Sequence, residues 1–219
     1  MKRYVSCFFL IFIGLISYDV EAQVSIGLSA GYVKAWQNYG DVDLPEDAET
    51  HIFGSQFRVK AYTKLGNRLS IGIEPGYIRR GAACIPGWIG EFVGDTKFLL
   101  EYADLPFSVS YRQPLFKSKW SINGRIGYGI SYLASATRVE EDLSGQLPIN
   151  RIRMDLVNDS ILNRLDHGLN LGAGIHYRIG ENQIFAEMIY YRSSMDAERF
   201  NTSQNRSLSY NLGYLFQLR

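Results

Sequence analysis

The sequence lacks a long hydrophobic run, a disulfide-forming pair of cysteines and an excess of charge of either sign. Its one continuous apolar stretch, residues 5–16, holds about a dozen residues, whereas a membrane-spanning helix needs roughly 20. Cys7 lies within that stretch, so Cys84 has no partner if the N-terminus is removed. With 23 basic and 22 acidic residues, the chain also lacks the basic excess that is typical of nucleic-acid binding.

The N-terminus has the layout of a secretory signal peptide. Lys2 and Arg3 supply the positive start, the apolar stretch follows, and small residues at Val20 and Ala22 precede a cleavage point before Gln23. We therefore predict that residues 1–22 are removed and that residues 23–219 form one domain.

Apolar residues occupy every second position in much of that domain. The last stretch shows the pattern most clearly, with its apolar set at Leu208, Tyr210, Leu212, Tyr214, Phe216 and Leu218. A period of two places these side chains on one face of a strand and the small or polar ones on the other. No amphipathic helix or second sheet is evident to cover the apolar faces, so lipid is the expected neighbour.

Eight stretches share this alternation, and the connections between them alternate between short and long. The expected strands are 24–34, 52–64, 69–79, 98–112, 119–132, 168–179, 183–193 and 206–218. An even number of strands with short turns at one end is the plan of bacterial outer-membrane barrels. We predict an all-β, eight-stranded, antiparallel, up-and-down transmembrane β-barrel in the outer membrane. The termini would lie in the periplasm and the long loops, 35–51, 80–97, 133–167 and 194–205, outside the cell.

Two prolines interrupt this pattern, Pro75 in the third strand and Pro106 in the fourth. Each removes one donor from a ladder, and a closed barrel has no free edge on which to place it. We expect a bulge or local opening at both positions. The alternative is that one of these strands is shorter than the alternation indicates.

The segments that contain these prolines resemble the paired strands of the PorT-like outer-membrane β-barrel family. "IGIEPGYIRRGA" (71–82) contains the Pro-Gly pair, Pro75 and Gly76, and "LLEYADLPFSVSYR" (99–112) contains the fourth-strand motif, at Tyr102, Leu105, Pro106 and Tyr111. Ala103 and Asp104 replace the usual Leu and Glu. The resemblance implies an eight-stranded barrel of the Bacteroidetes-type outer membrane. One member of that family is tied to protein secretion.

The C-terminal strand also resembles the insertion signal read by the outer-membrane assembly machinery, through Asn211, Gly213, Phe216 and Leu218. The chain ends in Gln-Leu-Arg rather than on an aromatic residue, which departs from the commonest form. An ordinary last strand is the alternative interpretation.

Strand parity predicts a charged interior. The inward-facing set is Arg58, Lys60, Glu74, Asp104, Arg125, His176, Arg178 and Glu187. An eight-stranded barrel is just wide enough for side chains to fill, and charges inside it must pair to offset their desolvation. We expect a solid polar plug. A narrow path for protons or small ions is the alternative.

The sequence offers weaker signs of a metal site and of catalysis. The acidic residues of 41–49 match no calcium-loop spacing. His51, His167, Asp166 and Ser160 could meet at the outer rim, but no spacing brings a nucleophile, a base and an orienting group together. In the loop 133–167, the arginines Arg138, Arg151, Arg153 and Arg164 are expected to pair with nearby acids. Contact with lipid phosphates at the outer leaflet is the alternative.

We therefore expect a barrel without catalytic activity, cofactor or metal, acting as a structural, binding or secretion-accessory protein. Its expected partners are outer-membrane lipid and lipopolysaccharide, the assembly machinery and a protein that contacts the long loops. The alternatives are a lipid-modifying enzyme, a narrow channel and, at the level of the fold, a soluble lipocalin-like barrel.

Overall fold

The computed structural model describes residues 23–38, 51–84, 95–115, 119–141, 148–156, 162–197 and 203–218. The predicted signal peptide, the acidic residues of 41–49 and Ser160 lie outside these ranges. Within them, no helix has the length and hydropathy needed to cross a membrane. The strands are β1 (Val24–Asn38), β2 (His51–Lys64), β3 (Leu69–Ile73), β4 (Gly76–Cys84), β5 (Asp95–Pro114), β6 (Trp120–Glu141), β7 (Pro148–Arg153), β8 (Leu165–Ile179), β9 (Asn182–Asp196) and β10 (Gln204–Gln217).

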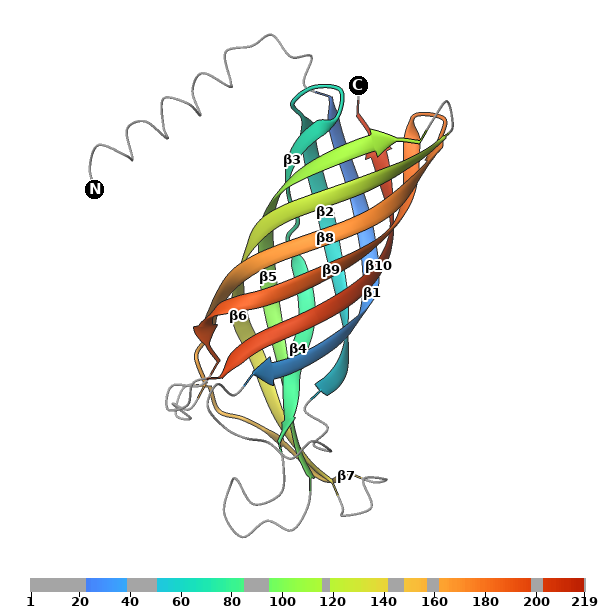
Figure 1. The fold of residues 1–219 in the computed structure, drawn as a ribbon. Helices are drawn as coiled ribbons and strands as arrows, with labels where there is room; N and C mark the ends of the chain where they lie inside the picture. The colour runs from blue at the N-terminus through green and yellow to red at the C-terminus, as the bar shows by residue number, and fades with distance from the viewer. Residues whose placement is uncertain are drawn as a thin grey trace, which may run out of the picture.

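The strands close into a ring in which every pairing is antiparallel (Figure 1). β1 pairs with β2 and β10, β9 lies between β10 and β8, and β6 lies between β8 and β5. β3 and β4 together fill the position between β2 and β5, so the ring has eight strand positions. β1 begins and β10 ends at the end of the barrel that carries the short turns (Figure 1). The predicted all-β, eight-stranded, up-and-down barrel is confirmed.

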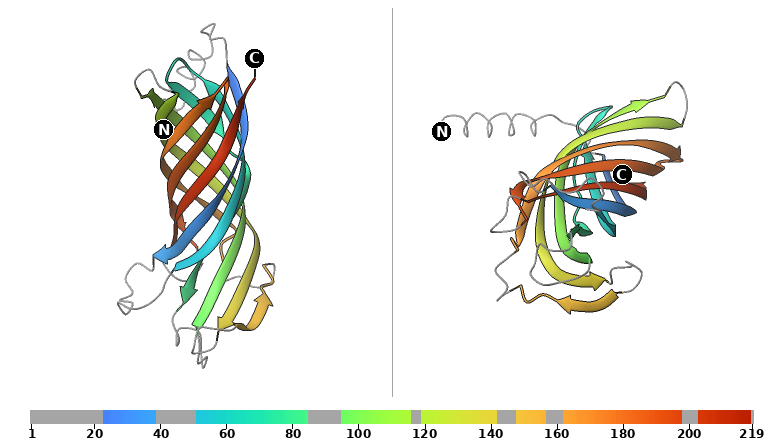
Figure 2. Two further views of the ribbon diagram at one scale, coloured as in Figure 1. Left: turned by 90° about the vertical axis from the view of Figure 1, so that its right-hand side faces the viewer. Right: turned by 60° about the horizontal axis from the view of Figure 1, so that its bottom comes forward.

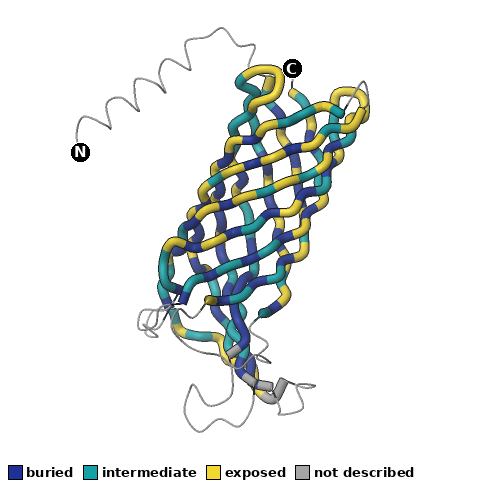
Figure 3. Tube along the Cα trace, in the orientation of Figure 1, coloured by how far each residue is buried: buried dark blue, intermediate teal, exposed yellow. Residues whose placement is uncertain are grey.

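Buried and exposed residues alternate along the long strands (Figure 3). In β10 the inward positions are small or polar, as at Ser207, Ser209 and Asn211, all nearly fully buried. From Leu208 onward the outward positions are large and apolar, and Leu212 is 71% exposed. Large apolar side chains lie exposed on the outer faces of all eight ring positions.

The predicted strand 69–79 is two strands, because the chain breaks its ladder at Glu74 and Pro75. Both prolines lie at this break, and the carbonyl of each still accepts a hydrogen bond. The Pro75 carbonyl accepts from the Val59 amide, and the Pro106 carbonyl accepts from the Glu74 amide. Because the N and O of one strand residue face the same neighbour, the missing Pro106 donor faces the break. The expected opening is therefore present at Pro75.

The expectation of a bulge or local opening near Pro106 is met by the break at Glu74 and Pro75, and no bulge lies at Pro106 itself. Pro106 lies opposite Gly129 in an unbroken part of the β5–β6 register. The irregularity in this ladder falls instead between Glu101 and Tyr102. The side of Pro106 that lacks an N–H faces the break between β3 and β4. No ladder hydrogen bond is therefore lost there, and no bulge is needed.

The strands extend further toward the loop end than the sequence pattern indicated. The largest difference is in the expected loop 133–167, where β6 continues to Glu141 and pairs with the additional strand β7. β5 and β6 pair along their whole lengths, from Asp95 opposite Glu141 to Pro114 opposite Ser121. Together β5, β6 and β7 form an extension beyond the loop-side ends of β1 and β9 (Figure 2).

Candidate functional site

The middle of the barrel is filled by ion pairs, and Glu74 lies at their centre. Its carboxylate is 2.6 Å from the Arg125 guanidinium, 3.4 Å from Lys60 Nζ and 3.6 Å from the Arg58 guanidinium. Glu187 joins the same group, because it pairs with Lys60 and lies 3.4 Å from Arg125. All five side chains are almost fully buried, so each charge depends on the others for its stability.

A second group of ion pairs continues from the first toward the loop end. Arg58 also lies 2.6 Å from Asp104, which is 3.6 Å from Arg80. Arg80 in turn lies 3.3 Å from Asp166. The Ser131 hydroxyl donates to Asp104 at 2.6 Å. The charged side chains thus form one continuous network of four cations and four carboxylates, which we call the interior network: Arg58, Lys60, Arg80, Arg125, Glu74, Asp104, Asp166 and Glu187.

Two members of the interior network, Arg80 and Asp166, were absent from the residues predicted from sequence. The predicted strands ended at 79 and began at 168, which left both in loops. Inward positions recur every second residue. The next one after Ile78 is Arg80, and the one before Gly168 is Asp166, so extending each predicted strand by two residues finds both. In the structure, Asp166 also accepts hydrogen bonds from Ser193 at 2.5 Å and Asn205 at 3.1 Å, so its burial is well compensated.

Arg178 is the one predicted interior residue that the structure leaves exposed, and that prediction is wrong. It has inward parity, but it is the residue before the end of β8, at the short-turn rim. A long arginine side chain at this position reaches water beyond the barrel opening. The other seven predicted residues, Arg58, Lys60, Glu74, Asp104, Arg125, His176 and Glu187, are buried inside.

Two glycines make room for the arginines of the interior network. A Cβ on Gly172 would lie 2.6 Å from Cγ of Arg125. One on Gly76 would lie 2.2 Å from the carbonyl oxygen of Phe57 and 2.7 Å from Cγ of Arg58. Gly76 is the glycine of the Pro-Gly pair noted in the sequence. Its position is therefore explained by the close approach of the β2 backbone at Phe57 together with the buried Arg58 side chain.

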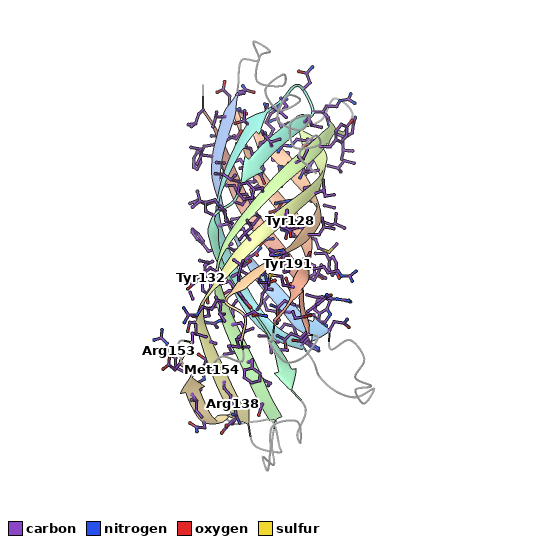
Figure 4. All side chains as sticks on the ribbon, turned by 90° about the vertical axis from the view of Figure 1, so that its left-hand side faces the viewer. Tyr128, Tyr132, Arg138, Arg153, Met154 and Tyr191 are labelled. Atoms are coloured by element: carbon purple, nitrogen blue, oxygen red, sulfur yellow. The ribbon has the colours of Figure 1, made fainter. Side chains whose placement is uncertain are left out.

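Toward the loop end the interior changes from charged to apolar. The buried apolar cluster there comprises Val33, Ala35, Ile52, Ile78, Ala83, Leu100, Tyr102, Leu133, Ala136 and Leu162. Arg80 lies at the boundary, with its guanidinium carbon 3.8 Å from the centre of the Tyr191 ring and 5.5 Å from that of Tyr102. Figure 4 labels Tyr191 within the barrel and Arg138, Arg153 and Met154 on the β6–β7 extension. The sequence pattern did not predict this apolar layer.

The interior leaves little open space near its short-turn end. A void lined by His176, Phe185 and Ser110 measures about 10 Å³, close to the minimum that holds one water. The His176 ring stacks on Phe185 with centroids 5.3 Å apart. This packing favours the predicted plug over an open path.

The resemblance motif residues fall on both faces of the wall. Tyr102 is inside, whereas Leu105 and Tyr111 are exposed outside, and the Tyr111 hydroxyl accepts from Arg68 at 3.2 Å. In the C-terminal segment, Asn211 is buried inside and Gly213 follows it at the next inward position. Phe216 and Leu218 are exposed on the outer face.

The described residues of the enzyme alternative, His51, His167 and Asp166, are not brought together. His51 and His167 lie on β2 and β8, with β1, β10 and β9 between them. His167 Nδ1 is hydrogen-bonded to the Tyr128 hydroxyl, while Asp166 points into the barrel toward Arg80. Among the described residues, no group of three metal-binding side chains is present.

The arginines of the β6–β7 region have mixed environments. Arg138 lies 2.9 Å from Glu140, as expected of pairing. Arg164 instead donates to the Leu156 carbonyl and, at 3.2 Å, to the Tyr132 hydroxyl. Arg151 and Arg153 are exposed on β7.

The outer wall carries a groove of about 750 Å³ beside the break between β3 and β4. Ile71, Ile73, Phe107, Val109 and Ile126 contribute to its apolar lining. The groove therefore belongs to the same apolar outer surface as the rest of the wall.

Comparison with known proteins finds no matching family model and no matching curated protein. Solved structures of similar shape include Neisserial surface protein A, with 16% identity, 87% of this chain and 95% of that chain covered, and a TM-score of 0.46. Another is Ail, the attachment invasion locus protein of Yersinia pestis, with 17% identity, coverage of 90% and 100%, and a TM-score of 0.45. The outer membrane enzyme PagL has 14% identity, coverage of 89% and 99%, and a TM-score of 0.42. These likenesses concern the fold alone.

Proposed function

We propose that this protein is an integral outer-membrane β-barrel that acts as a structural or binding protein without catalytic activity. The observation that carries the proposal is the combination of an apolar outer surface on every ring position with a charged interior. A soluble protein that exposed so continuous an apolar surface would aggregate. In a bilayer the same surface is solvated by lipid, and closure of the ring satisfies the backbone groups.

The orientation follows from the plan of outer-membrane barrels. The short turns, such as 65–68 and 180–181, and both termini would face the periplasm. The long connections and the β5–β7 extension would face outward. There they are the surface available to a protein partner. A secretion-accessory role, implied by the PorT-like resemblance, would use that surface.

Three features support a role without catalysis or conduction. The interior network joins its charges in ion pairs rather than leaving a reactive group open to a substrate. The histidines of the outer face contact aromatic rings, at Phe53 and Tyr128. The interior void beside His176 is too small for a path of water.

Membrane fractionation tests the proposal directly. The protein should remain in the outer-membrane fraction after a carbonate wash and should migrate faster on gels before heating than after it. Both results are expected because a closed ladder resists detergent until it is heated. Release by carbonate without a gel shift would contradict an integral barrel.

Orientation can be tested with single cysteines in a Cys84→Ser background. Asn67→Cys, at an exposed position in the turn between β2 and β3, should be protected from a membrane-impermeant maleimide in intact cells. Arg151→Cys on β7 should be labelled. The reverse labelling would show that the barrel is inserted the other way.

Conduction is tested separately. Discrete conductance steps in planar bilayers would favour the channel alternative over the proposed function.

A further inference from the structure

Three cations lie together on the outer face of β1, β9 and β10 near the loop end. Antiparallel register places Arg192 of β9 opposite Arg206 of β10, and Arg206 opposite Trp36 of β1. Lys34 is on the same face of β1, one outward position nearer the middle of the barrel, opposite Leu208. We call Lys34, Arg192 and Arg206 the basic cluster.

Among the residues that the structure describes, no carboxylate shares a row with the members of the basic cluster. In the row that contains Arg192 and Arg206, the other outward residues on β1, β2 and β8 are Trp36, His51 and Leu169. In the neighbouring row, the outward residues beside Lys34 are Tyr190, Leu208 and Phe53. The next acidic side chain along β9, Asp196, comes after a register shift and lies opposite Gln204.

This arrangement is unfavourable for the protein on its own. Like charges directly opposite across a ladder repel, and their Cβ atoms are only about 4.5–5.5 Å apart. None of the three cations makes an ion pair with a described residue, and Nε of Arg206 is buried without a hydrogen-bond partner in the described part of the chain. An anion placed between the two guanidinium groups would offset both costs.

The neighbours of the basic cluster indicate which anion reaches it. Trp36 and Tyr190 lie beside it with ring centroids 6.4 Å apart, and Tyr32 stacks on Phe53 at 5.3 Å. Aromatic side chains of this kind mark the headgroup level of a bilayer. Below them, the exposed residues Leu28, Leu212 and Ile184 continue the apolar surface. The anion expected at this level is therefore one carried by a lipid headgroup.

We propose that the basic cluster binds the phosphate group of a phosphorylated glycolipid in the leaflet at the loop end. Arg192 and Arg206 would each donate to the phosphate oxygens, Lys34 would add a third charge, and the acyl chains would lie along the apolar surface. The inference rests on the proposed function, because only an integral membrane barrel presents this face to lipid.

The test compares two variants with equal loss of charge at the same end of the molecule. The cluster variant is Arg192→Gln with Arg206→Gln, and the matched control is Arg151→Gln with Arg153→Gln on β7. Each barrel is purified in detergent and titrated with bis-phosphorylated lipid A, with lipid A lacking phosphate and with phosphatidylglycerol. Bound lipid is counted by native mass spectrometry.

The wild-type barrel and the control should bind phosphorylated lipid A at least about tenfold more tightly than the phosphate-free form, and the cluster variant should lose this preference. Equal binding by the cluster variant and the control would overturn the inference. Equal binding of phosphatidylglycerol by the wild type would overturn the assignment to a glycolipid. The heat-dependent gel shift of each sample separates these outcomes: a barrel that shifts but shows no preference contradicts only this inference, whereas a wild type that never shifts contradicts the proposed function.

Discussion

The interior network and the basic cluster are two groups of charged side chains on opposite sides of the same wall. Inside, four cations meet four carboxylates, and every carboxylate lies within 3.3 Å of at least one cation. Outside, three cations lie together, and no carboxylate of the described strands shares their rows. Among the described residues, the chain therefore matches buried charges with opposite ones, whereas the outward-facing cations of the basic cluster have no carboxylate in their rows.

The difference follows from what surrounds each group. In the interior the cost of desolvation is recovered only through close partners, so each charge must be matched by the protein itself. At a bilayer interface the headgroups supply counter-charges, and an internal carboxylate would compete with them. The partly exposed pair Arg79 and Glu101, 2.6 Å apart on the outer side of β4 and β5, shows that the outer wall also carries matched charges where the sequence provides them.

Neutralising Glu74 should have the largest effect on stability. Glu74→Gln leaves Arg58, Lys60 and Arg125 short of one carboxylate in a buried space, and breaking such a pair costs about 3–5 kcal/mol. Urea unfolding of the lipid-inserted barrel measures the change. The matched control is Glu101→Gln, which removes a partly exposed pair and should cost less than about 1 kcal/mol. Equal losses in the two variants would contradict the contrast between the two sides of the wall.

The ring and its two faces could be predicted from sequence because a period of two depends only on neighbouring residues. The alternation of apolar with small or polar residues in the segments 24–32 and 208–218 is enough to assign the two faces of those strands. The ends of the strands could not be predicted in this way, because they depend on partners distant in the chain: β6 continues to Glu141 because β5 and β7 pair with it there.

The same limit explains the residues missed at the site. Arg80 and Asp166 lie just beyond the predicted strands, and only the closed ring shows that they meet. Pro75 indicated an opening correctly, but its relation to Pro106 depends on the register between β3 and β5, which no local pattern contains. The basic cluster was missed because its three residues come from segments far apart in sequence.

Because Lys60 and Glu187 belong to the same interior network, the losses of unfolding free energy on replacing each of them should not be additive. Lys60→Met leaves Glu187 and Glu74 with one cation fewer, and Glu187→Met leaves Lys60 with one acid fewer. Lys60 contacts both acids, so removing Lys60 and Glu187 together restores a balance of three cations and three carboxylates. The double variant should be less destabilised than the sum of the single variants by about 0.5–3 kcal/mol in urea unfolding. Additive losses would show that the pairs act independently.

Salt should separate the two groups of charges. Raising ionic strength from about 0.01 M to about 1 M shortens the Debye length from about 30 Å to about 3 Å. Binding of phosphorylated lipid A at the basic cluster should weaken severalfold, because that site is open to ions. The urea midpoint of the barrel in a neutral lipid should move little by comparison, because the interior network excludes them. A fall in the midpoint that matches the loss of binding would mean that ions reach the interior.

The smallest effect is expected at Arg178, which shares inward parity with Arg125 but lies at the rim. Arg178→Gln should change the free energy of unfolding by no more than about 0.5 kcal/mol, since an exposed side chain away from a network contributes little. Arg125→Gln is the matched comparison: it removes the cation 2.6 Å from Glu74 and 3.4 Å from Glu187, and should cost several times more. Equal losses of unfolding free energy in the two variants would contradict this expectation. They would mean that burial among carboxylates does not determine how much an inward arginine stabilises the barrel, and that the interior network extends to the short-turn rim.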